Sequence, residues 1–237
     1  MEKCMCGRIR QAREPVDYIE SMNWNPRNLG KLADGLKYNV PPGTRPLVMH
    51  QLGDGSDQID RLFWGYKPEW YKRSPVINAR LDTILKKSPM WRSLLGKRVL
   101  VPADGWFEWT GETGDKQPWF IHAKNSEPIY MAAITAWQPG KEDDVEHGFA
   151  IVTDASAGGM VDIHDRRPVV LMPDAAREWT SPGTSVESAL ELLSTARPET
   201  AFAWHPVTRQ MSNVKYQEPN TNQTSAIQRP IDHRAKS

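Results

Sequence analysis

The amino-acid sequence predicts a single α+β domain with a barrel-like mixed sheet at its centre and short helices around it. Three observations predict this fold: apolar residues alternate in several segments of strand length, a few short segments have helical spacing, and no repeat or linker interrupts residues 6–217. With 237 residues, the chain can bury a substantial core in one domain. We place the domain at residues 6–219, a leader or mis-set start at 1–5, and a disordered tail at 220–237.

The first part of the chain predicts helices, one hairpin and one extended segment. Residues 14–24 have the spacing of a short amphipathic helix, and residues 88–97, which begin with a Ser-Pro pair, have that of another. Residues 47–52 and 59–66 alternate as two strands, and the Gly-Asp-Gly-Ser-Asp turn between them favours a hairpin. Residues 73–84 are expected to be extended.

The second part is richer in strands. Apolar and β-branched residues predict strands at 98–110, 118–123, 128–137 and 148–154. Helical spacing returns near the end of the domain, at 172–180 and 186–195.

Composition narrows the setting in which the protein works. Hydrophobic residues make up 39% and charged residues 25% of the chain, which is ordinary for a soluble globular protein. We find no signal peptide and no apolar run long enough to cross a bilayer. Cys4 and Cys6 are too close in sequence to form a useful disulfide. A reducing, cytoplasmic setting with two free thiols is therefore expected, with no membrane partner.

Positive charge is concentrated in one stretch of the chain. Residues 61–99 contain ten basic and two acidic residues, a balance of +8 in a protein whose net charge is +1. Cations that follow a phosphate backbone, together with aromatic rings that stack on bases at about 1–3 kcal/mol each, are typical of single-strand binding. Most aromatic residues here favour the core. Trp70 and Tyr71, which lie beside basic residues in a proline-flanked segment, are the expected exceptions.

The first candidate for chemistry is Cys6, which follows Met5. If the chain begins at Met5, removal of that methionine gives Cys6 a free α-amine. Such a 1,2-aminothiol has an amine pKa of about 7.7–8 and a thiol pKa of about 8.5, so both nucleophiles are partly available at neutral pH. The amine can form an imine with an aldehyde, and the thiolate can close it to a thiazolidine. A buried structural thiol is the alternative interpretation.

Two further residues have the chemistry of proton transfer. Glu108 lies among three aromatic residues, and an apolar surrounding favours the neutral carboxyl group that a general acid/base needs. A solvent-facing Glu108 is the equally weighted alternative. His164 lies between acidic residues and before two arginines, where it could relay a proton or bind a phosphate. A turn with ordinary salt bridges is its alternative.

Asn78 and Arg80 form a weaker candidate pair. Two residues apart, they share one face of an extended segment, where the amide could orient a nucleophile and the guanidinium could bind a phosphate. Metal binding is not expected, because the histidines show no ligand spacing and Cys4 and Cys6 are one residue apart.

Nine segments in order resemble one family, the SOS-response-associated peptidase (SRAP) or abasic-site-processing proteins. The segments are MCGR, YNVPPGT, FWGYKPEW, INAR, ADGWFEW, QPWFI, MAAI, DIHDRRPVVL and WHPVT followed by NVK. Together they cover nearly all of Met5–Gln217. The resemblance implies one α+β domain with a barrel-like core and a positively charged groove for single-stranded DNA or a single/double-strand junction.

The resemblance also implies a mechanism and a set of site residues. The N-terminal cysteine would form a thiazolidine crosslink with a ring-opened abasic site, protecting the lesion during the DNA damage response. The implied catalytic roles are nucleophile for Cys6, its orientation for Asn78, proton transfer for Glu108, and sugar-ring opening and reversal for His164. The implied DNA contacts are Arg8, Asn39, Arg80 and Arg166 to phosphates, and Trp70, Tyr71 and Trp109 to bases. No cofactor is implied, and a monomer that joins the nucleoid when bound to DNA is expected.

Two departures from the family pattern leave alternatives open. Trp70-Tyr71 stands where the family often has two tryptophans, so the second stacking contact would come from a tyrosine. Residues 1–5 would block the amine of Cys6, so either translation begins at Met5, which we favour, or the leader is removed by Cys6, Glu108 and His164. A thiol autopeptidase and a noncovalent reader of single-stranded or modified DNA are the competing functions.

Overall fold

The computed structural model describes residues 7–26, 36–141 and 144–219. Within these ranges the strands form a five-stranded and an eight-stranded sheet, accompanied by five short α-helices. The predicted α+β class is therefore confirmed. Cys6, the leader at 1–5 and the tail at 220–237 lie outside the described residues.

The small sheet is antiparallel throughout and has the strand order β13-β8-β7-β1-β2. In its register, Ile9 lies opposite Trp106, and Glu108 lies opposite Trp119. The N-terminal strand is thus held between a strand from the middle of the chain and β2. The bounds are β1 Ile9–Gln11, β2 Lys37–Val40, β7 Gly105–Thr110, β8 Gln117–Ala123 and β13 Phe202–Pro206.

The large sheet has the order β11-β10-β9-β6-β3-β4, with β12 paired to β9 and β5 paired in parallel to β10. Its β3–β4 hairpin confirms the predicted one. The bounds are β3 Leu47–Gln51, β4 Asp57–Arg61, β5 Asn78–Arg80, β6 Arg98–Ala103, β9 Ile129–Thr135, β10 Phe149–Ala155, β11 Arg166–Pro168 and β12 Val170–Leu171.

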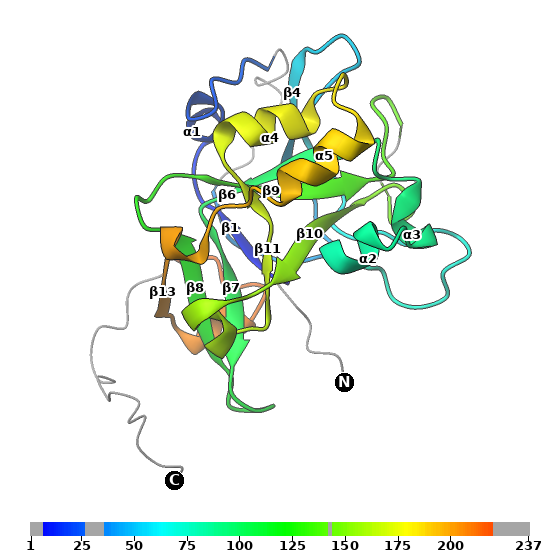
Figure 1. Cartoon of the computed structure of the whole chain (residues 1–237). Coiled ribbons are helices and arrows are strands. Elements are labelled where there is room, and N and C mark those ends of the chain that lie inside the picture. The colour runs from blue at the N-terminus through cyan, green and yellow to red at the C-terminus, as the bar shows by residue number, and fades with distance from the viewer. Residues whose placement is uncertain (1–6, 27–35, 142–143, 220–237) are drawn as a thin grey trace.

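Short helices cover one side of the large sheet. Figure 1 shows α4 and α5 crossing above β6 and β9, and Trp179 of α4 donates a hydrogen bond to the Val99 carbonyl of β6. Local sequence explains several helix starts: Ser185 caps α5 by accepting the Ser188 N–H, and proline begins α1, α3 and α4. The bounds are α1 Pro15–Glu20, α2 Leu81–Leu85, α3 Pro89–Arg92, α4 Pro173–Thr180 and α5 Val186–Leu193; three 3₁₀ turns are η2 Gly158–Asp162, η3 Glu199–Ala201 and η4 Arg209–Ser212.

Three sequence expectations are corrected. The segment 98–110 is two strands, because the chain turns at Asp104, whose carboxylate accepts the Ala12 N–H, and passes from one sheet to the other. The segment 73–84 is extended only in part, because Leu81 and Ile84 bury their side chains at helical spacing in α2. The barrel-like closure is wrong for the described residues: strands at the ends of the two sheets do not pair to close them.

The hydrophobic core forms two layers, one on each face of the large sheet. One fills the space between the sheets, with Ile9 and Trp106 from the small sheet and Met131 and Ile151 from the large one. The second lies under the helices on the opposite face of the large sheet. Because both faces are covered, β9 is buried along its whole length.

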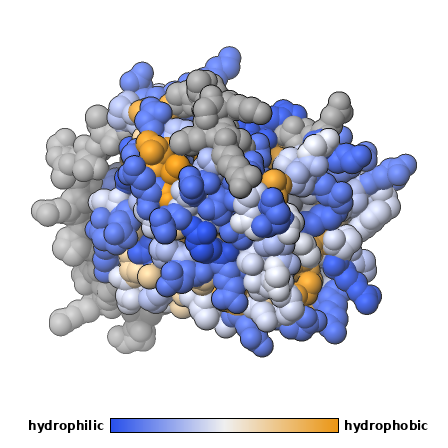
Figure 2. Space-filling view, turned by 90° about the horizontal axis from the view of Figure 1, so that it is seen from above, coloured by the Kyte–Doolittle hydropathy of each residue, from blue (hydrophilic) through white to orange (hydrophobic). Residues whose placement is uncertain are grey.

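The outer surface is mainly polar. In Figure 2, hydrophilic residues cover most of the face seen from above, and hydrophobic residues occur in small groups. No helix among the described residues combines the length and apolar character needed to cross a membrane.

Candidate functional site

Glu108 is buried on the inward side of β7. Side chains alternate along a strand, so Glu108 shares a face with Trp106, which belongs to the core between the sheets, whereas Phe107 packs on the outer face. Its exposed fraction of 2% excludes the solvent-facing alternative. A carboxyl group buried this deeply needs polar partners or a proton, and exchange of a proton is what acid/base chemistry requires.

His164 borders the same core from the large sheet's side. It follows η2, its backbone N–H donates to the Met160 carbonyl at 3.0 Å, and its side chain is buried. Two contacts make opposite demands on Nδ1. The Arg166 backbone N–H, at 3.1 Å, donates to a lone pair there, whereas the Asp165 carboxylate, at 3.0 Å, favours a proton. Such a ring is suited to proton transfer.

Asn78 begins β5, the strand that runs parallel to β10. It lies opposite Ile151 and is buried, whereas Arg80, two residues on, lies opposite Thr153 and is exposed at the strand's end. The preceding residue, Ile77, packs against the core between the sheets. The structure therefore places Asn78 at the border of the same core as Glu108 and His164.

The N-terminal strand leads to this border. Ile9 lies opposite Trp106, and the Phe107 N–H donates to the Arg8 carbonyl at 3.0 Å. The same antiparallel register, continued two residues before β1, brings Gly7, which follows Cys6 in the sequence, opposite Glu108.

Arg80 and Arg166 converge on one carboxylate that the sequence analysis did not single out. Arg80 binds Asp82 through two hydrogen bonds, at 3.0 and 2.8 Å, and Arg166 approaches it at 3.5 Å. The hydrogen bonds from Arg80, assisted by the charges of Arg166 and Lys86, lower the pKa of Asp82 to about 2. A phosphate that binds both arginines must therefore compete with Asp82. In the sequence, the two-residue spacing of Arg80 and Asp82 could have predicted this pair. The distant Arg166 had no such signal.

A second cluster holds Arg8 on the outer face of the small sheet. Its guanidinium donates to Asn39 Oδ1 at 2.6 Å and to the Met211 carbonyl at 3.1 Å, and lies 5.5 Å from the Trp109 ring centre. Burial lowers the pKa of Arg8. Asn39 is fully buried, and its amide donates to the Asn213 carbonyl at 2.9 Å, so here it supports Arg8. Direct contact of Asn39 with a phosphate stays a prediction.

Trp70 and Tyr71 lie on the segment between β4 and β5. The Trp70 side chain is 60% exposed, and the two rings meet edge to face with centres 6.0 Å apart. By contrast, Trp64, Tyr66 and Trp91 from the same basic stretch are buried, as predicted for most of its aromatic residues. An exposed tryptophan among cations has the properties of a base-stacking platform.

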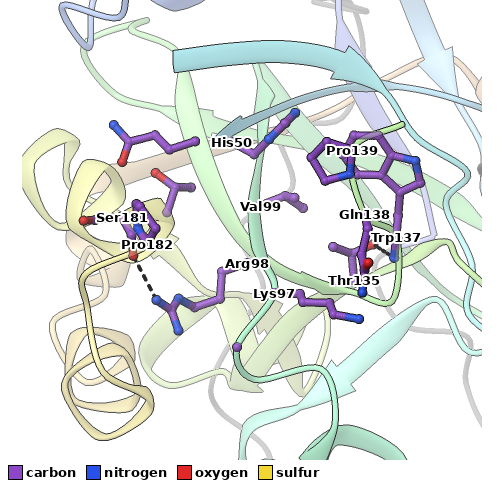
Figure 3. Close-up of a pocket in the computed structure, with 13 residues that line it drawn as sticks. His50, Lys97, Arg98, Val99, Thr135, Trp137, Gln138, Pro139, Ser181 and Pro182 are labelled. Atoms are coloured by element: carbon purple, nitrogen blue, oxygen red, sulfur yellow. Dashed lines mark hydrogen bonds between the residues drawn. The ribbon is translucent and has the colours of Figure 1, made fainter. Parts of the chain in front are cut away.

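Figure 3 shows a cavity of about 150 Å³ at the place in the large sheet where β6 begins and β9 ends. It is lined by the start of β6, the end of β9 and the segment after α4, where Arg98 donates to the Ser181 carbonyl at 3.1 Å. Residues predicted for the site are not among those that line it. We therefore separate this cavity from the candidate site.

Fold and site together define a class of protein: an α+β domain with a buried carboxyl group and a buried histidine beside its N-terminal strand, and arginines and an exposed tryptophan on its surface. The chain belongs to the SOS response associated peptidase (SRAP) family, whose model matches residues 5–214. The resemblance found in the sequence is thereby confirmed.

Named relatives and a solved structure agree with this assignment. The chain is 40% identical to the abasic site processing protein YedK of Escherichia coli (strain K12), over 90% of this chain and 96% of that protein. It is 28% identical to the abasic site processing protein HMCES of Rattus norvegicus, over 89% and 67% respectively. The crystal structure of a phage-related protein from Bordetella bronchiseptica matches with a TM-score of 0.78 and 48% identity, over 91% of this chain and all of that one.

Proposed function

We propose that this chain processes abasic sites in DNA, and that Cys6 crosslinks to the lesion as a thiazolidine. The names of its relatives support the substrate. The observation that carries the mechanism is the burial of Glu108 and His164 around one core, beside the strand that follows Cys6.

Crosslinking requires a proton donor and a proton acceptor beside the aldehyde carbon of the abasic site. In an abasic site the sugar ring opens to an aldehyde, and His164 assists by taking the proton of the anomeric hydroxyl group and giving a proton to the ring oxygen as the ring C–O bond breaks. The free α-amine of Cys6 adds to the carbonyl carbon, and Glu108 protonates the departing hydroxyl group, so that water leaves and an imine forms. The Cys6 thiolate then adds to the imine carbon, and the nitrogen regains a proton. One water is lost overall.

DNA is held by groups around this centre. Arg8, Arg80 and Arg166 supply cations for phosphates, and the exposed Trp70 supplies a ring for an unpaired base. Single strands, or junctions between single and double strands, are the substrates that offer unstacked bases.

The test uses a protein that begins at Met5 and whose processed N-terminus is verified by intact mass. Incubation with a single-stranded oligonucleotide that carries one abasic site should give an adduct that survives denaturing electrophoresis. Cys6→Ser should give none, because a hydroxyl group does not form a stable thiazolidine. An equally stable adduct from that variant would contradict the mechanism.

Self-processing is the second candidate, since a thiol assisted by a general base and a general acid can also attack a peptide carbonyl. Intact mass of the 237-residue chain decides it. Loss of residues 1–5 from the parent chain, and retention in Glu108→Gln, would support a peptidase step; retention in both would contradict it.

A further inference from the structure

An unusual group of basic side chains surrounds one aromatic ring on the outer face of the small sheet. Phe120 of β8 has the Arg10 guanidinium 5.4 Å from its ring centre, the His122 ring stacked on it at 5.5 Å and the His205 ring edge-on at 5.9 Å. The two histidine rings are themselves 5.4 Å apart. Three side chains that can carry positive charge therefore meet around Phe120.

A cavity of about 290 Å³ adjoins this group, lined by Arg10, Arg13, Asp104, Phe120 and His122, with Ala12 and Ser126. Gly105 lies opposite His122 and beside Arg10 in the sheet, and the Phe120 ring covers it so closely that an added Cβ would come within 2.8 Å of that ring. The missing side chain of Gly105 lets the Phe120 ring lie directly against the sheet beside Arg10 and His122.

The charges facing this cavity are mostly positive. Asp104 is the carboxylate that lines it, and it is shared between Arg13 at 2.6 Å, Arg10 at 3.6 Å and the Ala12 N–H at 2.7 Å. Arg10 Nε is buried and makes no hydrogen bond within the described structure. His122 Nδ1 lies 2.9 Å from the Ala123 carbonyl, which can only accept, so Nδ1 carries a proton and Nε2 remains for a ligand.

The cluster has more groups that can be positive than the one carboxylate, Asp104, that lines its cavity. Burial, and then the nearby positive charges of His122 and Arg10, lower the pKa of His205. An anion would relieve this repulsion and raise the pKa of His205 again. A metal is the less suitable ligand, because no group of three or more potential ligands occurs in the described ranges.

We propose that Arg10, His122 and His205 form a second phosphate subsite, which binds the DNA backbone beyond the residues assigned to the reaction centre. The choice of DNA rests on the proposed function. Arg8 and Arg10 point to the same face of β1, about 6.6 Å apart for two residues of a strand. A strand bound at Arg8 can therefore continue over the Phe120 cluster.

The subsite makes DNA binding sensitive to pH. The groups that face it are Arg10 and Arg13 from β1 and the residues after it, Asp104, His122 of β8 and His205 of β13. Since a bound phosphate raises the pKa of His205, binding takes up protons and strengthens as pH falls. Linkage limits the effect to about tenfold per pH unit for each proton taken up.

Noncovalent binding is measured with Cys6→Ser protein and an undamaged single-stranded oligonucleotide, by fluorescence anisotropy between pH 8 and 6. Affinity should rise as pH falls, and His122→Asn with His205→Asn should flatten the profile. Arg10→Gln should reduce the slope of log affinity against log salt by about 1. His147→Asn, which removes a half-exposed histidine bound to Asp144, should keep the parent profile. Parent-like profiles in the cluster variants would overturn the proposal.

NMR of the histidine ring signals distinguishes DNA phosphate from free inorganic phosphate. Because it uses the parent protein, its outcome does not depend on whether a variant folds. Micromolar oligonucleotide should shift the ring signals of His122 and His205 in the parent protein, whereas inorganic phosphate should do so only at much higher concentration. Equal response to free phosphate, or no response to DNA, would overturn the subsite. Failure of abasic crosslinking with an intact histidine response would instead refute the proposed function alone.

Discussion

Glu108 and Trp70 mark two regions that contrast in almost every physical respect. Glu108 sits in the middle of a paired strand, 2% exposed, against the core between the sheets. Trp70 lies on a connecting segment and is 60% exposed, with Tyr71 as a ring neighbour. One side chain is held in place by the fold, and the other is left accessible by it.

This contrast distinguishes a residue that transfers protons from a residue that contacts DNA. A proton-transfer group acts over hydrogen-bond distance, so a rigid, buried strand is a suitable support. A ring that stacks on successive bases needs access and tolerates several geometries. Substitutions in the two regions should therefore alter different measured quantities.

The largest effect is expected at Glu108. Glu108→Gln keeps the shape of the side chain but cannot exchange the proton, so the single-turnover rate of crosslinking should fall by about 10²- to 10⁴-fold. Binding to undamaged single-stranded DNA should change little. Quenched time courses on denaturing gels give the rate, and anisotropy gives the affinity.

The matched control is Glu112→Gln, an exposed carboxylate in the turn after the same strand. It should leave the rate within experimental error of the parent. If Glu108→Gln reduced DNA affinity and rate together, the separation between the two regions would fail.

Trp70→Ala should show the opposite pattern. Loss of one stacked base, worth about 1–3 kcal/mol, weakens DNA binding by roughly 5- to 150-fold. Because the ring is exposed, the melting temperature should stay within about 1–2 °C, as for ordinary surface substitutions. Leu85→Ala, an exposed apolar side chain in the same basic stretch, is the control and should alter neither quantity. A large loss of thermal stability in Trp70→Ala would show that the ring supports the fold.

These regions differed in how far the sequence could predict them. The exposure of Trp70 followed from its polar and proline-containing surroundings. The side of β7 that Glu108 faces did not, because aromatic residues lie on both sides of it and both faces of that strand are covered. The turn at Asp104 was missed for a similar reason: apolar residues continue across it, and the change of sheet is decided by contacts with the N-terminal segment.

The sequence also could not predict charge interactions between residues that are far apart in the chain. Arg166 reaches Asp82 across 84 residues, through the pairing of β5 and β11 on either side of β10. The expected phosphate-binding arginines were thus found together, but with a competing carboxylate between them. Local spacing predicts the Arg80–Asp82 pair alone.

The smallest effect is expected for a substitution of Asp82. Its effect on DNA affinity should not depend on pH, which distinguishes it from the histidine cluster. Asp82→Asn releases Arg80 and Arg166 for phosphates, so affinity for undamaged DNA should increase, by at most about fivefold because exposed ion pairs are weak. The folded-state pKa is lowered to about 2, so the stabilising contacts of Asp82 persist above the ordinary carboxyl range and are lost only as pH falls towards 2. The carboxylate therefore stays charged from pH 5 to 8, and the gain in affinity should be constant over that range. Asp144→Asn, at an exposed carboxylate bound to His147, is the control and should give no gain. A gain that varies with pH would mean that titrating histidines, rather than the two arginines released from Asp82, dominate the contact with DNA.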